Sequence, residues 1–410
     1  MTSPQQPDPQ PAANDSLPTQ PPREAGFLSG VDHLPTHWGS GWISGVLSIG
    51  LGIVGLGAVL CLHFPSLLTM AELRGKYPLL LVRGVLFAVL IASFVLGLMS
   101  VWLRERKILG ITGLLLTLAA MLLGGASAPV GEVSQNSPYL GLDWFLLNLI
   151  VFSLVFVPLE RLFARQREQP VFRRDWQTDL TYFFISSLLV QTTTYLTLKP
   201  AGWLFGWAQI APLRAAVRLQ PFWLQLIEIL LVTDLTQYWV HRLFHRLPLL
   251  WRFHEIHHSA EVMDWLAGSR LHLVDVIVTR GLSYVPVYWL GFGDPAVFAY
   301  IAIVSLQATF IHANVRFEFG PLKWLVATPQ FHHWHHSAER EAIDKNFAVH
   351  LPIWDWLFGT LYLPDRWPAA YGLAGGKRLP PGYLRQLVHP FRASAAAHEA
   401  GGENDSREQP

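Results

Sequence analysis

Eight apolar runs of about twenty residues each dominate this sequence. They cover residues 43–62, 79–103, 108–125, 141–160, 178–199, 222–240, 272–292 and 296–313. A helix of that length and composition spans the hydrocarbon core of a bilayer. Only 14% of the residues are charged, whereas soluble proteins carry about 25%. The sequence therefore predicts an all-α, multi-pass membrane helical bundle with about eight spanning helices.

Composition divides the chain into four segments. Residues 1–40 are rich in proline, glutamine and serine, and we expect a disordered N-terminal tail because they offer little apolar surface to bury. Residues 41–130 are predicted to form accessory transmembrane helices. Residues 140–365 contain the clustered histidines, and residues 366–410 are expected to be a C-terminal tail.

Net charge and cysteine content exclude two classes of function. The formal net charge is +1, so the chain as a whole offers no strongly basic surface for a nucleic acid. Cys61 is the only cysteine, which excludes a disulfide framework and a cysteine-ligated metal cluster.

Basic residues predict the orientation in the membrane. They gather in the loop at 104–107 and again in the loop at 161–175, whereas the loop at 126–140 has none. The positive-inside rule places the two basic loops in the cytoplasm. Continued alternation brings the chain to the cytoplasmic side just before His241. We expect a bacterial cytoplasmic membrane protein with its histidine clusters on that side.

Three histidine clusters carry the chemistry of the sequence. Their members are His241 and His245, then His254, His257 and His258, then His332, His335 and His336. Spacings of three and four residues place histidines on one face of a helix. Same-face imidazoles at these spacings are typical of metal ligands. Eight of them exceed the needs of one tetrahedral zinc ion, so the pattern favours two metal ions with open positions.

Further residues are candidates for the same site. His312 lies at the end of the hairpin of 272–292 and 296–313, on the predicted cytoplasmic side, and we expect it to be a ligand. His272 begins that hairpin and could be a ligand or could support one. Asp234 continues the helical stripe of His241 and His245, where its carboxylate could fix the tautomer of a histidine.

Two short motifs suggest other functions. Gly50, Gly52 and Gly55 fit GxGxxG, but no strand precedes them and no acidic residue follows at the ribose distance, so close helix packing is the better interpretation. Residues 254–258 also fit HExxH, the motif of zinc metalloproteases, with Glu255 as the base. An intramembrane HExxH protease therefore stays open as an alternative. It leaves the cluster at 332–336 unexplained.

The histidine boxes and their surroundings resemble the fatty acid hydroxylase superfamily, which includes sterol desaturases, sphingolipid and fatty-acid hydroxylases and alkylglycerol monooxygenase. The resemblance lies in DLTQYWVHRLFHRLPLLWRFHEIHHSAE and in TPQFHHWHHS followed by DKNFAVHLPIWDWLFGT. It covers roughly residues 140–365. It implies that the eight clustered histidines and His312 are the ligands. Some members carry a further histidine where this chain has Arg316, so water, His272 or Asn314 could complete the set.

The resemblance also implies an activity. Members are integral membrane enzymes that use two ferrous ions and O2 to hydroxylate an unactivated C–H bond of a lipid, and some desaturate instead. Zinc can replace iron in a preparation, because an all-imidazole site accepts both. This sequence contains no cysteine cluster and no nucleotide-binding fold, so a separate electron donor (a reductase, ferredoxin or cytochrome) is implied. A metal transporter is a third alternative, disfavoured by the few polar residues in the hairpin runs.

Overall fold

The computed structural model describes residues 39–71, 78–134 and 137–392. Regular secondary structure in these ranges is helical, and extended pairing is limited to two isolated bridges, Ala164 with Val315 and Ser337 with Tyr371. The predicted all-α class is thus confirmed for the described part of the chain. The expected N-terminal tail lies outside the described residues except for residues 39 and 40.

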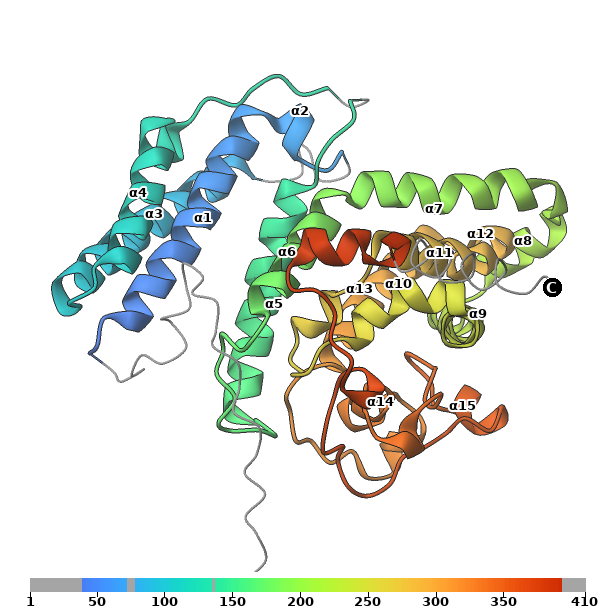
Figure 1. The fold of residues 1–410 in the computed structure, drawn as a ribbon. Coiled ribbons are helices and arrows are strands. Elements are labelled where there is room, and N and C mark those ends of the chain that lie inside the picture. Colours follow the sequence, from blue (N-terminus) through green and yellow to red (C-terminus); the bar gives the residue numbers. More distant parts are fainter. Residues whose placement is uncertain (1–38, 72–77, 135–136, 393–410) are drawn as a thin grey trace, which may run out of the picture. The chain divides into compact units, whose positions relative to one another are not determined.

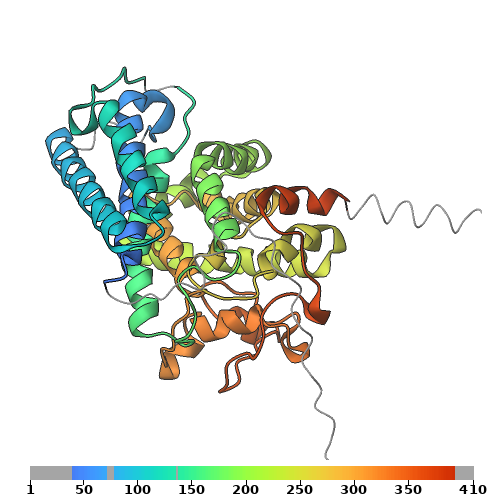
Figure 2. The same ribbon diagram turned by 60° about the vertical axis from the view of Figure 1, so that its left-hand side comes forward.

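Three long helices, α1 (Trp42–His63), α3 (Leu79–Leu103) and α4 (Ile108–Leu122), pack side by side in both views (Figures 1 and 2). The short elements α2 (Pro65–Leu68) and η1 (Gly125–Ser127) follow α1 and α4. A Cβ atom at Gly52 would lie 2.9 Å from Leu116, and one at Gly55 would lie 2.6 Å from Leu90. Gly52 and Gly55 therefore let helices approach closely, as the sequence interpretation expected, whereas Gly50 has no close neighbour.

Gly113 provides a test of this packing. A Cβ atom there would lie 2.0 Å from the Ser48 hydroxyl oxygen and 3.0 Å from the Ser48 carbonyl carbon. We expect Gly113→Leu to destabilise the protein by about 1–3 kcal/mol, because overpacking shifts α4 away from α1. Thermal unfolding in detergent measures the effect. Gly50→Leu is the control, because nothing lies within 4 Å of a Cβ at that position. Equal loss in both variants would contradict the packing role.

The remaining helices form the part of the chain that carries the histidines (Figure 1). They are α5 (Leu142–Leu162), α6 (Trp176–Leu188), α7 (Val190–Phe205), α8 (Ala211–Leu219), α9 (Phe222–Arg246), α10 (Pro248–His258), α11 (Leu273–Ser283), α12 (Val285–Leu290), α13 (Asp294–Phe310), α14 (Pro329–His335) and α15 (Ile353–Leu357). Five 3-10 turns join them: η2 (Gly206–Ala208), η3 (Ala267–Ser269), η4 (Gly320–Trp324), η5 (Arg340–Ala342) and η6 (Ala374–Gly376). Helix α9 is central, because α10, α11 and α13 all pack against it.

Five helical segments of the described chain are long and apolar enough to cross a membrane: Trp42–His63, Leu79–Leu103, Ile108–Ser127, Leu142–Leu162 and Leu273–Leu290. They correspond to five of the eight expected spans. The run at 178–199 is instead divided at Leu189 between α6 and α7. Helix α9 has the length but carries Glu228 and Asp234 among its apolar residues, and α13 has only 17 residues.

Candidate metal centre

The three histidine clusters lie on three helices whose ends are set by local sequence. His241 and His245 occupy the last turns of α9, and Pro248 then starts α10 because proline suits the first position of a helix. Helix α10 carries the second cluster. The third lies on α14, which begins at Pro329 with the Thr328 hydroxyl accepting a hydrogen bond from the Phe331 backbone N–H.

The nine predicted ligands gather into two buried groups. The five-histidine group contains His241, His245, His254, His258 and His335, and the four-histidine group contains His257, His312, His332 and His336. In each group one ring nitrogen of every member lies within 4.8 Å of those of the others. The two HxxHH boxes exchange members. The first and last histidines of each box, four residues apart, enter one group, and the middle histidine enters the other.

Hydrogen bonds fix the tautomer of several rings. Nδ1 of His241 lies 2.7 Å from the Phe347 carbonyl oxygen, and Nδ1 of His254 lies 2.6 Å from a carboxylate oxygen of Asp275. Carbonyl and carboxylate oxygens only accept hydrogen bonds, so both Nδ1 atoms carry the proton and both Nε2 atoms are bare. Those Nε2 atoms are 3.0 Å apart. Two lone pairs facing each other at that distance repel unless a cation lies between them.

The four-histidine group repeats this arrangement. Nδ1 of His257 donates to the Arg270 carbonyl oxygen at 3.2 Å, and Nδ1 of His312 donates to the Ala308 carbonyl oxygen at 2.7 Å. Their bare Nε2 atoms are 3.4 Å apart. Metal–imidazole bonds of about 2.1 Å place neighbouring ligand nitrogens of one ion about 3.0–3.4 Å apart. Both groups therefore fit a metal ion, and each contains at least one pair of nitrogens that requires a cation.

Burial keeps the rings neutral and ready to bind. Burial away from water is the main cause that lowers the pKa of His241, and the nearby imidazole of His254 is the second. Together they lower the pKa of His241 to about 3. The same two causes, burial first and neighbouring imidazoles second, hold the pKa values of five other members well below the ordinary histidine range: His245, His257, His258, His332 and His336. At neutral pH these imidazoles are unprotonated, as metal ligands must be.

Asp275 is a functional residue that the sequence analysis missed. Its side chain is buried, with one carboxylate oxygen on His254 Nδ1 and the other accepting from the Thr279 hydroxyl at 3.0 Å. A carboxylate behind a ligating imidazole orients the ring and raises its basicity. The available signal was its place in α11, three residues after His272, but no rule of spacing connects it to His254.

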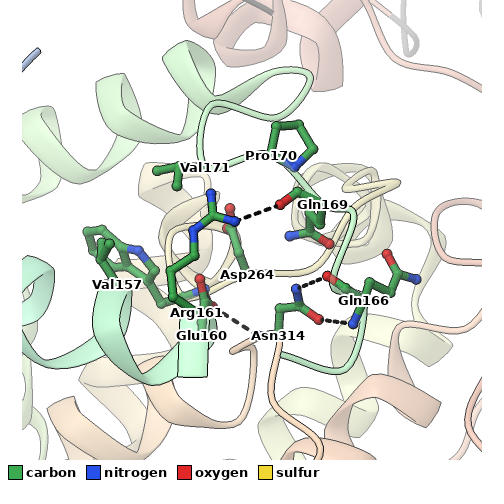
Figure 3. A pocket seen from close by; sticks show the side chains of 10 residues that line it. Val157, Glu160, Arg161, Gln166, Gln169, Pro170, Val171, Asp264 and Asn314 are labelled. Atoms are coloured by element: carbon green, nitrogen blue, oxygen red, sulfur yellow. Dashed lines mark hydrogen bonds between the residues drawn. The ribbon is translucent and has the colours of Figure 1, made fainter. Parts of the chain in front are cut away.

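Two other candidates lie outside both groups. His272 caps α11, where its Nδ1 accepts from the Val274 backbone N–H and its Nε2 lies 3.0 Å from the Leu387 carbonyl oxygen. Asn314 uses its side-chain amide on the backbone of Gln166, with contacts of 2.9 and 3.1 Å (Figure 3). Both side chains are thus engaged elsewhere, and neither completes the ligand set at the position of Arg316.

Asp234 serves the site differently from the expectation. Its carboxylate accepts backbone hydrogen bonds from Val349, His350 and Leu351 at 2.8–3.1 Å rather than a hydrogen bond from a histidine ring. It therefore fixes the loop after α14. That loop supplies the Phe347 carbonyl to His241 and the Lys345 carbonyl to His335, so Asp234 supports the ligands through the backbone.

Asp355 holds the same loop from the other end. Its two carboxylate oxygens accept the backbone N–H groups of Phe347 and Ala348, each at 2.8 Å. We expect Asp355→Ala to destabilise the protein by about 1–3 kcal/mol, because two buried N–H groups lose their acceptors. Thermal unfolding of the metal-free protein measures this. Replacement of the exposed Asp365 by alanine should change stability by less than about 0.5 kcal/mol. An unchanged melting temperature in Asp355→Ala would contradict this role.

Glu255 points away from the ligating nitrogens. Its buried carboxylate is paired with Lys377 Nζ and lies 3.1 Å from His389 Nε2. An HExxH protease needs this carboxylate free beside the metal to act as a base. The geometry therefore removes the catalytic base of the protease interpretation, although His254 and His258 do share a group.

The residues after 365 belong to the site rather than to a free tail. Lys377 and His389 hold Glu255, and the Tyr371 hydroxyl lies 2.9 Å from His333 Nδ1. Residues 383–392 form a helix. Within the expected C-terminal tail at 366–410, residues 366–392 thus supply partners to buried polar groups on α10 and α14. Residues beyond 392 lie outside the described part of the chain.

Comparisons with known proteins agree with this geometry. Residues 226–360 match the family model for fatty acid hydroxylase. The ornithine lipid hydroxylase OlsE of Rhizobium tropici is 34% identical over 172 residues, which are 42% of this chain and 51% of the relative. Alkylglycerol monooxygenase of Homo sapiens is 35% identical over 34% of this chain and 31% of its own length. Very-long-chain aldehyde decarbonylase GL1-7 of Oryza sativa subsp. japonica is 29% identical over 35% and 25%.

The alignments cover about half or less of these relatives' lengths. No solved structure matches the chain. The site is therefore a candidate metal centre made of buried histidines, most of which lie on helices α9, α10 and α14. Residues 226–360, which match the family model for fatty acid hydroxylase, hold all three histidine boxes.

Proposed function

We propose that this protein is a membrane-bound, O2-dependent lipid hydroxylase with two iron ions, one in each histidine group. The observation that carries the proposal is the pair of bare Nε2 atoms in each group, 3.0 Å apart in one and 3.4 Å in the other. The relatives named as lipid hydroxylase and alkylglycerol monooxygenase support the reaction type. Iron bound there would supply the activation of O2.

The reaction balances with an external electron donor. One oxygen atom of O2 enters a C–H bond of the lipid and the other leaves as water, which consumes two electrons and two protons. The described residues include one cysteine, Cys61, and show no cysteine cluster that could store electrons. A separate reductase, ferredoxin or cytochrome would therefore deliver them. The basic loops at 104–107 and 161–175 support a cytoplasmic position for the centre and hence a cytoplasmic donor.

The chain's own residues have defined tasks in this proposal. The nine histidines hold the ions through neutral nitrogens. Asp275 and the carbonyl oxygens of Phe347 and Lys345 keep three rings in the tautomer that presents Nε2. Burial of both groups keeps bulk water from the reacting atoms. Desaturation of the same lipid on the same site remains the second candidate, because both reactions begin at the same C–H bond.

Lipid profiling tests the proposal. We expect membranes of cells that express the protein to contain a lipid with one additional oxygen atom, absent when His335 is replaced by alanine. Mass spectrometry of extracted lipids checks this, with ¹⁸O2 as the source of the label. Loss of two hydrogens without oxygen would indicate desaturation. No lipid change in a preparation that carries two irons per chain would contradict the proposal.

A further inference from the structure

A cavity borders the five-histidine group and not the other one. It has a volume of about 300 Å³, and His245, His258 and His335 form part of its wall. None of the four-histidine group lines it. Ring nitrogens Nε2 of His245 and His335 are buried without a hydrogen-bond partner. A molecule in this cavity would therefore meet the metal centre at the five-histidine group.

The size of the cavity suits a small-molecule ligand. Ligand pockets begin at about 300 Å³. A second cavity, beside α5, measures only about 30 Å³ and is lined by polar groups such as Glu160, Arg161 and Asp264 (Figure 3). At about 10–15 Å³ per water molecule, it holds only a few waters. The cavity at the five-histidine group is the one of these two that can admit a substrate.

Apolar residues form part of the wall of the larger cavity. Trp251, Ile343 and Leu373 line it, and no lysine or arginine does. Its polar lining beyond the histidines is limited to Ser337 and Asp344. An anionic headgroup would find no cationic side chain among these lining residues, whereas an alkyl chain can contact the apolar ones.

We propose that this cavity receives the alkyl chain of the lipid substrate, and that Ile343 and Leu373 determine how far the chain enters and which carbon is hydroxylated. The proposal rests on lipid hydroxylation as the function. It adds the cavity by which the lipid reaches the metal centre, the part of the lipid that enters, and the two residues that limit how far the chain enters. Ile343 is 47% exposed and Leu373 is buried, so Ile343 stands at the mouth and Leu373 deeper in the wall.

Ile343→Trp narrows the mouth and is the first test. We expect its rate on the longest chains to fall about tenfold relative to short ones, a discrimination typical of steric pockets. Leu373→Ala should shift hydroxylation to a carbon further along the chain. Ile353→Trp is the matched control, because Ile353 is 49% exposed on α15 and does not line the cavity. Iron content, measured in every variant, should stay at the wild-type level.

Photolabelling gives a readout that does not need turnover. The zinc-loaded full-length chain in phosphatidylcholine nanodiscs is irradiated with a long-chain lipid carrying a mid-chain diazirine. We expect label on peptides containing Trp251, Ile343 and Leu373, reduced in Ile343→Trp and unchanged in Ile353→Trp. Label confined to the membrane helices, or equal product patterns in both tryptophan variants, would overturn the proposal while leaving hydroxylation intact. Label in the cavity of a protein that changes no lipid would support chain binding and count against the reaction.

Discussion

Replacement of His335 by alanine is expected to remove the metal from the five-histidine group and to abolish lipid oxidation. His335 belongs to the third histidine box but lies among ligands from the first two, with its Nδ1 held by the Lys345 carbonyl at 2.8 Å. A metal ion bound to this group would therefore join α14 to α9 and α10 through His335. Elemental analysis should show a loss of about one metal per chain, and product formation should fall by at least about 100-fold, beyond the effect of losing a supporting group.

His333→Ala is the matched control for this prediction. His333 neighbours the candidate ligands on α14 and is equally buried. Its ring nitrogens contact the Tyr371 hydroxyl and the His312 backbone carbonyl rather than the ring nitrogens of either group. It should retain both metals. Glu255→Gln adds a test of the protease alternative. That enzyme would keep its metal in His335→Ala and lose its activity in Glu255→Gln, whereas we expect the reverse. Full metal content in His335→Ala would contradict the two-group assignment.

Asp275→Asn is expected to weaken metal binding in the five-histidine group by about 10–100-fold. The carboxylate accepts the proton-bearing Nδ1 of His254 at 2.6 Å. An amide in its place accepts more weakly, and if its NH2 faces the ring it favours the wrong tautomer, which would place the proton on Nε2. Competition with a calibrated chelator measures the change in metal affinity. The free energy of unfolding of the metal-free variant should lie within about 1–3 kcal/mol of the wild-type value.

Asp344→Asn is the control for Asp275→Asn. Asp344 is partly exposed, and its carboxylate lies 3.5 Å from His245 Nδ1, beyond a good hydrogen bond. The same chemical change there should alter metal affinity by less than about threefold, because solvent screens exposed charges. Equal effects at both positions would show that net negative charge, rather than orientation of His254, determines the affinity.

Histidine spacing predicted which residues gather together but not how they divide into two groups. Spacings of three and four residues identified the histidines that gather at the centre. A helical face is broad enough, however, to serve two neighbouring ions, so spacing alone did not reveal that His257 and His335 leave their own boxes for the opposite group. That exchange depends on the angle between α10 and α14, which a linear pattern does not contain.

The expected number of membrane-spanning helices was counted from apolar runs, which do not show where a helix is interrupted. Apolar runs predicted α1, α3, α4 and α5 closely, because a lipid-facing helix must be apolar along its length. The run at 178–199 is as long, yet the chain divides it at Leu189. Helix α7 packs against α11 and α12 but leaves Tyr195, Leu196 and Trp203 exposed. Composition therefore predicted one continuous run where the fold has two helices.

The sequence by itself determined the helical class, the membrane character and the identity of the histidines, because residue type and local period are encoded along the chain. The tertiary structure decided which residues support those histidines. Asp275, the carbonyls of Phe347 and Lys345, and the partners of Glu255 at 377 and 389 are far from their histidines or from α10 in sequence. The physical reason is that hydrogen bonds and metal coordination act over about 2–3 Å, and such proximity exists only after the chain has folded.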